Sequence, residues 1–403
     1  MNGASLAMGT MPLLKDVHVP GMVLGTVSQG RRDVEASGVC GTNGVPVTAD
    51  TCFDLASVTK VVATTCLLHR LMSLGQINPD DPISHYLPWS PSTSTIRTIA
   101  YHRAGLWEWQ PLYLSGKDPV TTLVDLPLRY EPNTNRHYSD LGFMLLGLLV
   151  ETVTGTPLDT AFAELIAAPL NLTHTGFTPV TQHPVTPHPV IPHPVILPQA
   201  GSPTRTGDRR RSCLRQDDTW WRQDDELGNP VTPSISSSGW GDTIEQHMVA
   251  TSTPYPVLFH NPSFPWRTYE TIGEPNDGNA FHCFAGVAGH AGLFSSVHDL
   301  LTLLESLAHT DPLWGDCTQV YADGPDNGQA FGWRSMTATV NGTSHRMLWH
   351  PGFTGCAVGF VPGTGFAITL LTNRLLAPTP PDTISLWEKA LTHVDAISEW
   401  RIP

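Results

Sequence analysis

The pattern of apolar and polar positions predicts a helix that begins near Ser57 and ends at Gly75. The residues between them are rich in apolar side chains and contain neither glycine nor proline. A serine before such a run and a glycine after it are typical signals of helix ends. The same pattern predicts further helices, which we place at residues 141–152, 158–166, 299–308 and 384–394. Ser296 or Asp299 would cap the third of these.

Short runs of strand-forming residues at both ends of the chain predict an antiparallel sheet. Two of them, at residues 23–28 and 34–39, flank a polar turn at residues 30–32 and form a hairpin. Three more strands are predicted near the C-terminus, at residues 346–350, 356–361 and 365–371. Strands from the two ends should pair with one another, because an unpaired strand edge exposes free backbone groups.

These elements predict an α+β fold, in which helices flank the antiparallel sheet and a mostly helical subdomain stands beside it. Residues 1–85 and 286–403 would form the sheet subdomain, and residues 86–285 the helical subdomain. The helix after Ser57 and the C-terminal helix can cover the sheet. A chain of 403 residues is longer than a single core usually is, which agrees with two subdomains. The active cleft would lie between them.

Residues 178–275 interrupt this pattern and are expected to form an insertion. Its marked features are three His-Pro-Val triplets, a basic cluster and a tryptophan pair, which lie at His183, His188 and His193, at residues 205–211, and at Trp220 and Trp221. We expect a solvated surface insertion, of which the tryptophans could make a part pack. The alternative is a lid or docking loop over the cleft. Metal binding by the three histidines is less favoured, because no carboxylate is interleaved with them.

The composition excludes several classes of protein. A net charge of −14 argues against a general nucleic-acid binder, since such proteins neutralise phosphates with a basic surface. The first residues show no basic segment and no unbroken apolar stretch, so we expect no signal peptide, no membrane span and a cytoplasmic location. The seven cysteines form no C-x-x-C pair, which predicts reduced thiols. No metal and no cofactor is expected, and the oligomeric state stays open.

Ser57 and Lys60 are the first candidates for chemistry. A spacing of three residues brings both to one face of a helix, and a serine in the first turn lies near free N–H groups. A desolvated lysine has a lowered pKa and could take the serine proton. The unreactive alternative is a capping serine beside an exposed lysine. The other candidates lie at the ends of predicted elements and are Tyr138, Asp140, His350 and Gly352.

The motifs S-x-x-K, Y-x-D and H-x-G, in this order, resemble those of the serine beta-lactamase and penicillin-binding-protein superfamily. Its class C branch is the most similar, and that branch also holds esterases, D-amino-acid peptidases and transacylases. The resemblance spans roughly residues 18–176 and 276–395. It includes the glycine-rich segment 287–296, which contains His290.

This resemblance implies roles in acyl transfer. Ser57 would be the nucleophile that carries the acyl group as an ester. Lys60 would hold or remove the proton of Ser57, and Tyr138 would be a second acid or base. His102 is interpreted as a packing histidine. His290 is interpreted as a loop histidine with a satisfied side chain, and its alternative role is catalytic.

The resemblance also implies how the substrate is bound. The backbone N–H groups of Ser57 and Phe353 would form the oxyanion hole, with Phe353 presented by an edge strand. Gly352 would let the substrate approach that strand closely. His350 would hydrogen-bond the leaving group, a substrate carboxylate or Tyr138, and its alternative role is structural.

Two departures from the family pattern narrow the substrate. Asp140 stands where the family has asparagine, and an ionised aspartate would keep Lys60 charged or repel an anion. His350 stands where the family has lysine, so a permanent cation for a substrate carboxylate is missing. We therefore predict a serine hydrolase that acts on a small-molecule ester or amide through an acyl-enzyme. The alternatives are a transacylase, a true beta-lactamase or D-Ala carboxypeptidase acting on a lactam or peptide, and a non-catalytic sensor of acyl ligands.

Overall fold

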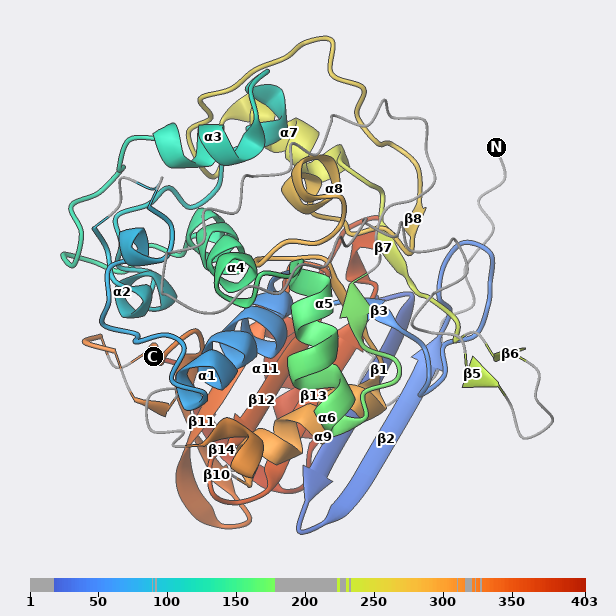
Figure 1. Ribbon diagram of the computed structural model, residues 1–403. Coiled ribbons are helices and arrows are strands. Elements are labelled where there is room, and N and C mark those ends of the chain that lie inside the picture. Colours follow the sequence, from blue (N-terminus) through green and yellow to red (C-terminus); the bar gives the residue numbers. More distant parts are fainter. Residues whose placement is uncertain are drawn as a thin grey trace.

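The structure is a computed structural model that describes most of the chain. The described residues are 18–88, 90, 93–177, 223–224, 230–231, 233–309, 311–315, 321–322, 324–326 and 328–403. Within them, a large antiparallel sheet packs against helices, as Figure 1 shows. The α+β fold expected from the sequence is therefore confirmed.

Seven strands form the central sheet in the order β14-β10-β11-β12-β13-β1-β2, and each neighbouring pair is antiparallel. Their bounds are Gly21–Ser28 (β1), Arg31–Gly38 (β2), Arg334–Val340 (β10), Thr343–Pro351 (β11), Ala357–Val361 (β12), Phe366–Thr372 (β13) and Ile397–Arg401 (β14). In the pairing of β1 with β13, Val23 lies opposite Leu371. Strands from the two ends of the chain therefore do pair, as expected.

The hairpin of β1 and β2 turns earlier than the sequence suggested. Gln29 and Gly30 form the turn with φ of 53° and 75°, the left-handed values that a two-residue hairpin turn requires. Arg31 and Arg32 therefore lie in β2 and not in the turn. Because β2 is an edge strand, its charged side chains can point to solvent.

The helices lie on both faces of the sheet. Their bounds are Cys66–Ser73 (α1), Ile96–Ala100 (α2), Pro119–Asp125 (α3), Asp140–Thr154 (α4), Leu158–Phe162 (α5), Ala168–Leu170 (α6), Thr243–Thr251 (α7), Gly278–Phe284 (α8), Val297–Ala308 (α9) and Thr383–His393 (α11). Helix α11 covers one face, where Trp387 stacks on Trp349 of β11 with ring centroids 5.9 Å apart. Helix α9 and the helix after Ser57 pack on the opposite face.

Serine side chains cap the N-termini of α4 and α9. The Ser139 side chain accepts a hydrogen bond from the backbone of the first turn of α4 at 3.1 Å, and Gly155 ends that helix with φ of 72°. Ser296, one of the two caps expected for α9, accepts from the N–H of Asp299 at 3.4 Å. The first residues of both helices therefore follow the preference for a serine at the N-cap.

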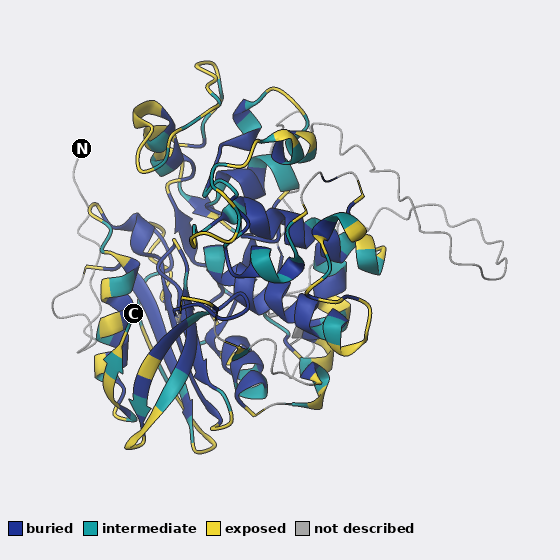
Figure 2. Cartoon of the chain, turned by 90° about the vertical axis from the view of Figure 1, so that its left-hand side faces the viewer, coloured by how far each residue is buried: buried dark blue, intermediate teal, exposed yellow. Residues whose placement is uncertain are grey.

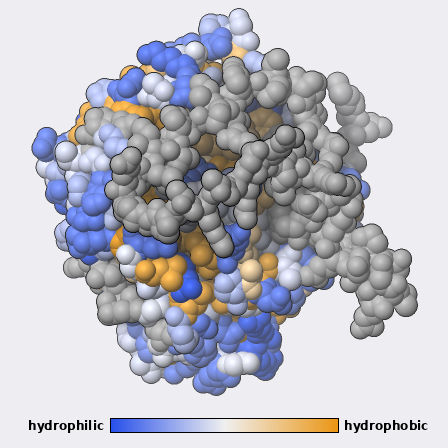
Figure 3. Space-filling view, viewed as in Figure 1, coloured by the Kyte–Doolittle hydropathy of each residue, from blue (hydrophilic) through white to orange (hydrophobic). Residues whose placement is uncertain are grey.

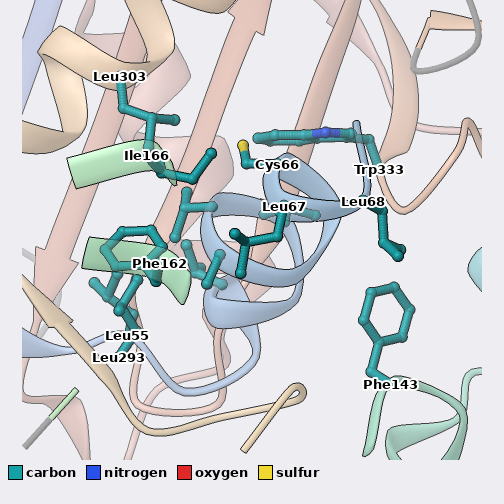
Figure 4. Close-up of a cluster of buried hydrophobic side chains, with 14 of the residues drawn as sticks. Leu55, Cys66, Leu67, Leu68, Phe143, Phe162, Ile166, Leu293, Leu303 and Trp333 are labelled. Atoms are coloured by element: carbon teal, nitrogen blue, oxygen red, sulfur yellow. The ribbon is translucent and has the colours of Figure 1, made fainter. Parts of the chain in front are cut away.

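One hydrophobic core joins the sheet to the helices. It contains side chains from β1, β12 and β13 and from α1, α4, α5 and α9. Figure 4 shows Leu67 and Leu68 of α1 in this core, with Phe162 of α5 and Phe143 of α4 to either side. Figure 2 shows the strands and inner helices as mostly buried. The helix that follows Ser57 is thus held by the sheet and by the helical layer together.

Three small sheets complete the described part of the fold. They pair β3 (Phe53–Asp54) and β4 (Gly176–Phe177) with β9 (Leu293–Ser295), β7 (Ser237–Gly239) with β8 (Thr271–Ile272), and β5 (Gln223–Asp224) with β6 (Pro230–Val231). In the first of them, Phe53 lies opposite Ser295. This sheet carries the chain directly into the turn that contains Ser57.

The expected insertion at residues 178–275 is in part a folded element. Residues 233–275 contain α7, β7 and β8, so the expectation of a solvated insertion is wrong for them. The physical reason is a buried ion pair: Arg267 lies 2.7 Å from Asp242 and also donates to the backbone carbonyl of Pro275. The histidine triplets, the basic cluster and the tryptophan pair lie outside the described residues.

The length and hydropathy of the described helices bear on whether they could span a membrane. None of them alone is both long enough and apolar enough to cross a bilayer. Helix α4 reaches that length only together with residues Leu158–Leu170, from which it is bent by 75°. On the face seen in Figure 3, hydrophilic side chains cover most of the lower part and hydrophobic ones gather near the middle.

Candidate active site

Ser57 lies in a strained turn at the start of the predicted helix. A 3-10 turn at Ala56–Val58 and a π-helical turn at Lys60–Thr65 precede α1. Ala56 has φ of 44°, a left-handed conformation that a residue with a Cβ seldom adopts. Such strain persists only where the surroundings hold it, and it occurs preferentially at functional sites.

Asp54 provides the contacts that hold this turn. One oxygen of its carboxylate accepts from the N–H of Ala56 at 2.8 Å, and the other accepts from the N–H of Asn276 at 2.7 Å. Burial raises the pKa of Asp54 to about 6, although the two N–H donors act to lower it. Thr354 donates to the backbone oxygen of Asp54 at 2.7 Å, which ties the loop after β11 to the same residue. No motif in the sequence indicated this role of Asp54.

Lys60 is fully buried, and its ammonium group has three partners. Its Nζ lies 2.8 Å from Ser57 Oγ, 2.7 Å from Asp140 Oδ1 and 3.1 Å from the backbone oxygen of His290. A protonated lysine has three N–H donors and no acceptor. A charged Lys60 therefore donates to Ser57 and to the carbonyl of His290, and forms an ion pair with Asp140.

The pKa of Lys60 is raised, so the expectation of a lowered value is wrong. Burial lowers this pKa, but the charges of Asp140 and Tyr138, and hydrogen bonds to both, raise it by more. Desolvation alone would lower the pKa of Lys60, but Asp140 together with Tyr138 outweighs it. Asp140 instead keeps Lys60 charged, which was the other possibility that the sequence offered. In this state Lys60 can donate to Ser57 but has no lone pair for its proton.

Tyr138 lies beside Lys60 and near two histidines. The Nζ of Lys60 is 5.1 Å from the centroid of the Tyr138 ring. The ring of His102 is 4.6 Å and that of His350 is 6.0 Å from the same ring, centroid to centroid. Burial and nearby cations lower the pKa of His102 well below its ordinary value, and its Nδ1 accepts from the N–H of Ser139 at 3.1 Å. A neutral His102 thus packs against Tyr138, which the sequence did not indicate.

His350 ends β11 and presents a neutral ring. Its Nδ1 lies 2.8 Å from the carbonyl oxygen of Pro351 and so carries the hydrogen. Burial lowers the pKa of His350 well below its ordinary value, and the charges of Arg334 and Lys60 lower it further. Its buried Nε2 therefore keeps a lone pair, which has no partner among the described residues. His350 can accept a hydrogen bond but does not replace the charge of a lysine.

Strand β11 also brings Gly352 and Phe353 to the Ser57 turn. The expectation of an edge strand is wrong, because β11 lies between β10 and β12 inside the sheet. A Cβ at position 352 would collide with the carbonyl oxygen of Leu55, so glycine permits the close approach of strand and turn. The backbone N–H of Phe353 donates to no described residue, and its side chain is 44% exposed. The two N–H groups expected to form the oxyanion hole therefore belong to adjoining segments.

Arg334 is a cation at the site that sequence reasoning missed. It begins β10 and lies opposite Trp349, the neighbour of His350. Its guanidinium carbon is 5.8 Å from the ring centroid of Tyr138 and 5.6 Å from that of Trp349. Within the described ranges, no carboxylate pairs with it. Only the pairing of β10 with β11 brings Arg334 here, and no motif in the sequence marks it.

The structure also places the remaining histidine of the motif region. His290 is buried in a loop, with Nε2 2.9 Å from Asp277 Oδ1, but its buried Nδ1 has no hydrogen-bond partner among the described residues. The described residues contain no group of three or more histidine, cysteine, aspartate or glutamate side chains placed to hold a metal ion. The chemistry therefore has to be argued from the side chains around Ser57.

The fold and the site together define a class of protein. A buried lysine held against a serine on a strained turn, with a tyrosine beside it and a strand end opposite, is an arrangement for acyl transfer through a serine ester. The model of the family described as Beta-lactamase matches residues 11–390. The chain belongs to the beta-lactamase family.

Curated relatives and solved structures agree with this assignment. The chain is 29% identical over 370 residues to "Putative D-alanyl-D-alanine carboxypeptidase" of Escherichia coli K12, covering 83% of this chain and 71% of the relative. It is 27% identical over 369 residues to the protein of the same name in Salmonella heidelberg, with coverage of 83% and 72%.

Solved structures share the fold at low sequence identity. A class C beta-lactamase from Rhodobacter sphaeroides superposes with a TM-score of 0.57 at 19% identity, covering 93% of this chain and 95% of that one. SurE with D-Leu gives a TM-score of 0.60 at 18% identity, with coverage of 97% and 75%. The protein is a serine hydrolase of the beta-lactamase family that acts on a small molecule by acyl transfer.

Proposed function

We propose that Ser57, Lys60 and Tyr138 are the catalytic residues, and that the substrate is an amide with a carboxylate beside the scissile bond. A peptide that ends in a D-amino acid has this chemistry. The observation that carries the proposal is Arg334, a cation beside Tyr138 without a carboxylate partner in the described part of the chain. The sequence alone favoured a substrate without a carboxylate, because the lysine of the family motif is replaced by His350. Arg334 supplies a cation that this reasoning lacked.

In the proposed reaction, the oxygen of Ser57 attacks the substrate carbonyl and the leaving amine departs. Lys60 is held protonated by Asp140, so it orients and polarises Ser57 but does not take its proton. Tyr138 is the titratable group next to Lys60, and we assign to it the transfer of the proton from Ser57 to the leaving amine. Water then hydrolyses the ester, with the proton returning along the same path.

The oxyanion formed in each step needs donors on one side of the carbonyl. The N–H of Ser57 belongs to the first turn of a helix, where N–H groups have no acceptor within the helix. The N–H of Phe353 has no acceptor among the described residues. Both are backbone groups on segments that the contact of Gly352 with Leu55 holds together, so they are oriented before the substrate arrives.

Arg334 is suited to hold the carboxylate of the substrate. A guanidinium group offers paired N–H donors that match the two oxygens of a carboxylate. Its ring neighbours are Tyr138, beside Lys60, and Trp349, which stacks on α11, and neither ring supplies a negative charge. His350, neutral and with a free lone pair, can accept a hydrogen bond from Tyr138 or from the leaving amine.

A matched pair of substrates tests the proposal. One is an N-acyl-D-Ala-D-Ala peptide, and the other is the same peptide with a C-terminal amide in place of the carboxylate. For the unmodified protein we expect a kcat/KM at least about tenfold higher for the carboxylate, the scale of a hydrogen bond to a charged group. Arg334→Gln should remove this preference, and Arg334→Lys should retain a part of it. Arg401→Gln, at the exposed end of β14, is the control and should leave the ratio unchanged.

The outcomes separate the candidate substrates. Equal kcat/KM for the two peptides in the unmodified protein would reject the role of Arg334. The neutral ester or amide that the sequence favoured would then be the better candidate substrate. Release of the acyl group to an added amine or alcohol, in place of water, would identify a transacylase. The cytoplasmic location expected from the sequence stays a prediction, which fractionation of cells that express the full chain would test.

A further inference from the structure

The segment from Asn276 to Leu293 contacts the Ser57 helix at several points. At its start, the N–H of Asn276 donates to Asp54, which holds the strained turn. At its end, the carbonyl oxygens of Gly289 and His290 accept from Thr64 Oγ1 at 2.6 Å and from Lys60 Nζ at 3.1 Å. Of these contacts, only the one between Lys60 and the His290 carbonyl involves a residue that we propose as catalytic. The segment nevertheless reaches both Asp54, three residues before Ser57, and the amine of Lys60 beside it.

One acidic and one basic side chain, Asp277 and His290, hold this segment together. The Nε2 of His290 lies 2.9 Å from Asp277 Oδ1, which also accepts from the N–H of Ala280 at 2.7 Å. Burial raises the pKa of Asp277, but His290 and these hydrogen bonds lower it to about 2. Asp277 is therefore a carboxylate at neutral pH, and it fixes the ring of His290 from across the segment.

A close backbone contact fixes the other side of the segment. A Cβ at Gly289 would collide with the carbonyl oxygen of Phe143 in α4, and a Cβ at Gly147 would lie against Gly289. The backbone at residues 289–290 is thus packed tightly between α4 and the Ser57 helix. The direction in which the His290 carbonyl points depends on this packing and on the bond from His290 to Asp277.

We infer that Asp277 and His290 are positioning residues for Lys60. The bond between their side chains orients the backbone carbonyl of His290, and that carbonyl takes one of the three N–H groups of Lys60. With one N–H held by this carbonyl, the ammonium keeps its ion pair with Asp140 at 2.7 Å and its hydrogen bond to Ser57 Oγ at 2.8 Å. The inference rests on the proposed function, because it assumes that the Lys60 to Ser57 contact matters for catalysis.

The inference predicts a change in pH dependence as well as in rate. A hydrogen bond from the ammonium to the carbonyl stabilises the charged form of Lys60, so losing it lowers the pKa of Lys60. The alkaline limb of the kcat/KM profile should then move to lower pH. The other charged or titratable groups around Lys60 and Tyr138 are Asp140, His102, His350, Arg334 and Asp277, and the variants below leave the first four unchanged.

The experiment compares His290→Leu with His290→Gln in the full chain. Leucine keeps the bulk but cannot donate to Asp277, whereas the glutamine amide can reach it with an N–H. For His290→Leu we expect kcat for a p-nitrophenyl ester to fall about tenfold or more, KM to stay within about twofold, and the alkaline limb to shift downward. His290→Gln should recover most of the rate and the original pH profile.

A matched control is present on α8. His282 is also buried, and its Nε2 lies 2.8 Å from Asp242 Oδ2, but this pair does not lead to Lys60. His282→Leu should lower the midpoint of thermal unfolding and leave the alkaline limb in place. If His290→Leu and His282→Leu behave alike, with the limb unshifted in both, the role of His290 is structural and the inference is wrong.

Two further measurements keep the test decisive. If His290→Leu fails to fold, Asp277→Asn retains the size and the helix cap while removing the charge. It should shift the alkaline limb in the same direction by a smaller amount, and an unshifted limb in this variant overturns the inference. Ester hydrolysis that persists in Ser57→Ala would instead reject the proposed function itself.

Discussion

Replacing Asp54 with asparagine should change how the stability of this protein depends on pH. The carboxyl group is buried, and its pKa rises from an ordinary value of 3.8 to about 6. The folded state therefore binds this proton more tightly than the unfolded state does. The resulting contribution to stability is fully present below pH 3.8 and is lost as the pH rises through about 6.

The magnitude follows from the two pKa values. At about 1.36 kcal/mol for each pH unit, a rise from 3.8 to about 6 corresponds to about 3 kcal/mol of unfolding free energy. Asparagine does not titrate. The unfolding free energy of the unmodified protein, measured relative to Asp54→Asn, should therefore fall by about 3 kcal/mol between roughly pH 3.5 and pH 7.

Urea unfolding followed by tryptophan fluorescence at several pH values measures this difference. The control is Asp80→Asn, since the pKa of Asp80 is lowered by its bond to Arg97 and its side chain is 63% exposed. Its contribution should be small and of opposite sign. A difference between the unmodified protein and Asp54→Asn that stays constant from pH 4 to pH 7 would refute the reasoning, because it would show that Asp54 titrates alike in both states.

The same substitution has a functional consequence. Asp54 accepts hydrogen bonds from two backbone N–H groups, those of Ala56 and Asn276. An asparagine side chain has one acceptor oxygen, so one of these N–H groups would lose its partner. The strained conformation of Ala56 would then be held less firmly. We expect acylation of Ser57 to slow in Asp54→Asn at neutral pH, even where the loss of the buried charge offsets the cost to stability.

Two other substitutions test the assignment of the catalytic residues. Ser57→Ala should abolish ester hydrolysis and the acyl adduct detected by intact-mass spectrometry; an adduct on any other residue would show that the nucleophile is misassigned. Lys60→Met and Tyr138→Phe should each lower the rate about 100-fold or more, the scale of lost general acid–base catalysis. The two losses should not add in the double variant, because both residues act on one proton path. Near-normal turnover by Tyr138→Phe would remove Tyr138 from the mechanism.

The strands and helices that the sequence predicted well carry local signals. The strands of the first hairpin, the cap at Ser296 and the apolar run after Ser57 all depend on neighbours in the chain. Strand β10 was not predicted, although it carries such a signal, since Met336, Ala338 and Val340 alternate with more exposed residues. Strand β14 had almost none, because it is a short, charged edge strand.

The parts of the site that the sequence missed depend on contacts between distant segments. The bonds from Asn276 to Asp54 and from Lys60 to His290 each join residues more than 200 positions apart. The sequence left the sign of the Lys60 pKa shift open. It depends on the balance between burial and a carboxylate at 2.7 Å, and a motif gives the identity of Asp140 but not that distance.

A further prediction concerns the position of the cation that binds the substrate carboxylate. Sequence comparison alone suggests that His350→Lys would add a missing charge. In the structure, Lys60 and Arg334 already lie near His350 and lower its pKa. A lysine at position 350 would be a further buried cation, and an unpaired buried charge costs several kcal/mol. We therefore expect the single substitution to destabilise the fold without improving the binding of carboxylates.

The double variant, His350→Lys with Arg334→Gln, moves the charge from β10 to β11 and leaves the net charge of the site unchanged. Arg334 and His350 lie on adjacent strands, since Arg334 is opposite Trp349. If the site needs one cation at this edge, the double variant should prefer the carboxylate peptide over its amide more strongly than Arg334→Gln alone does. If the double variant shows no such gain, while His350→Lys alone binds the carboxylate better at no cost in stability, then Arg334 is not the group that holds the carboxylate.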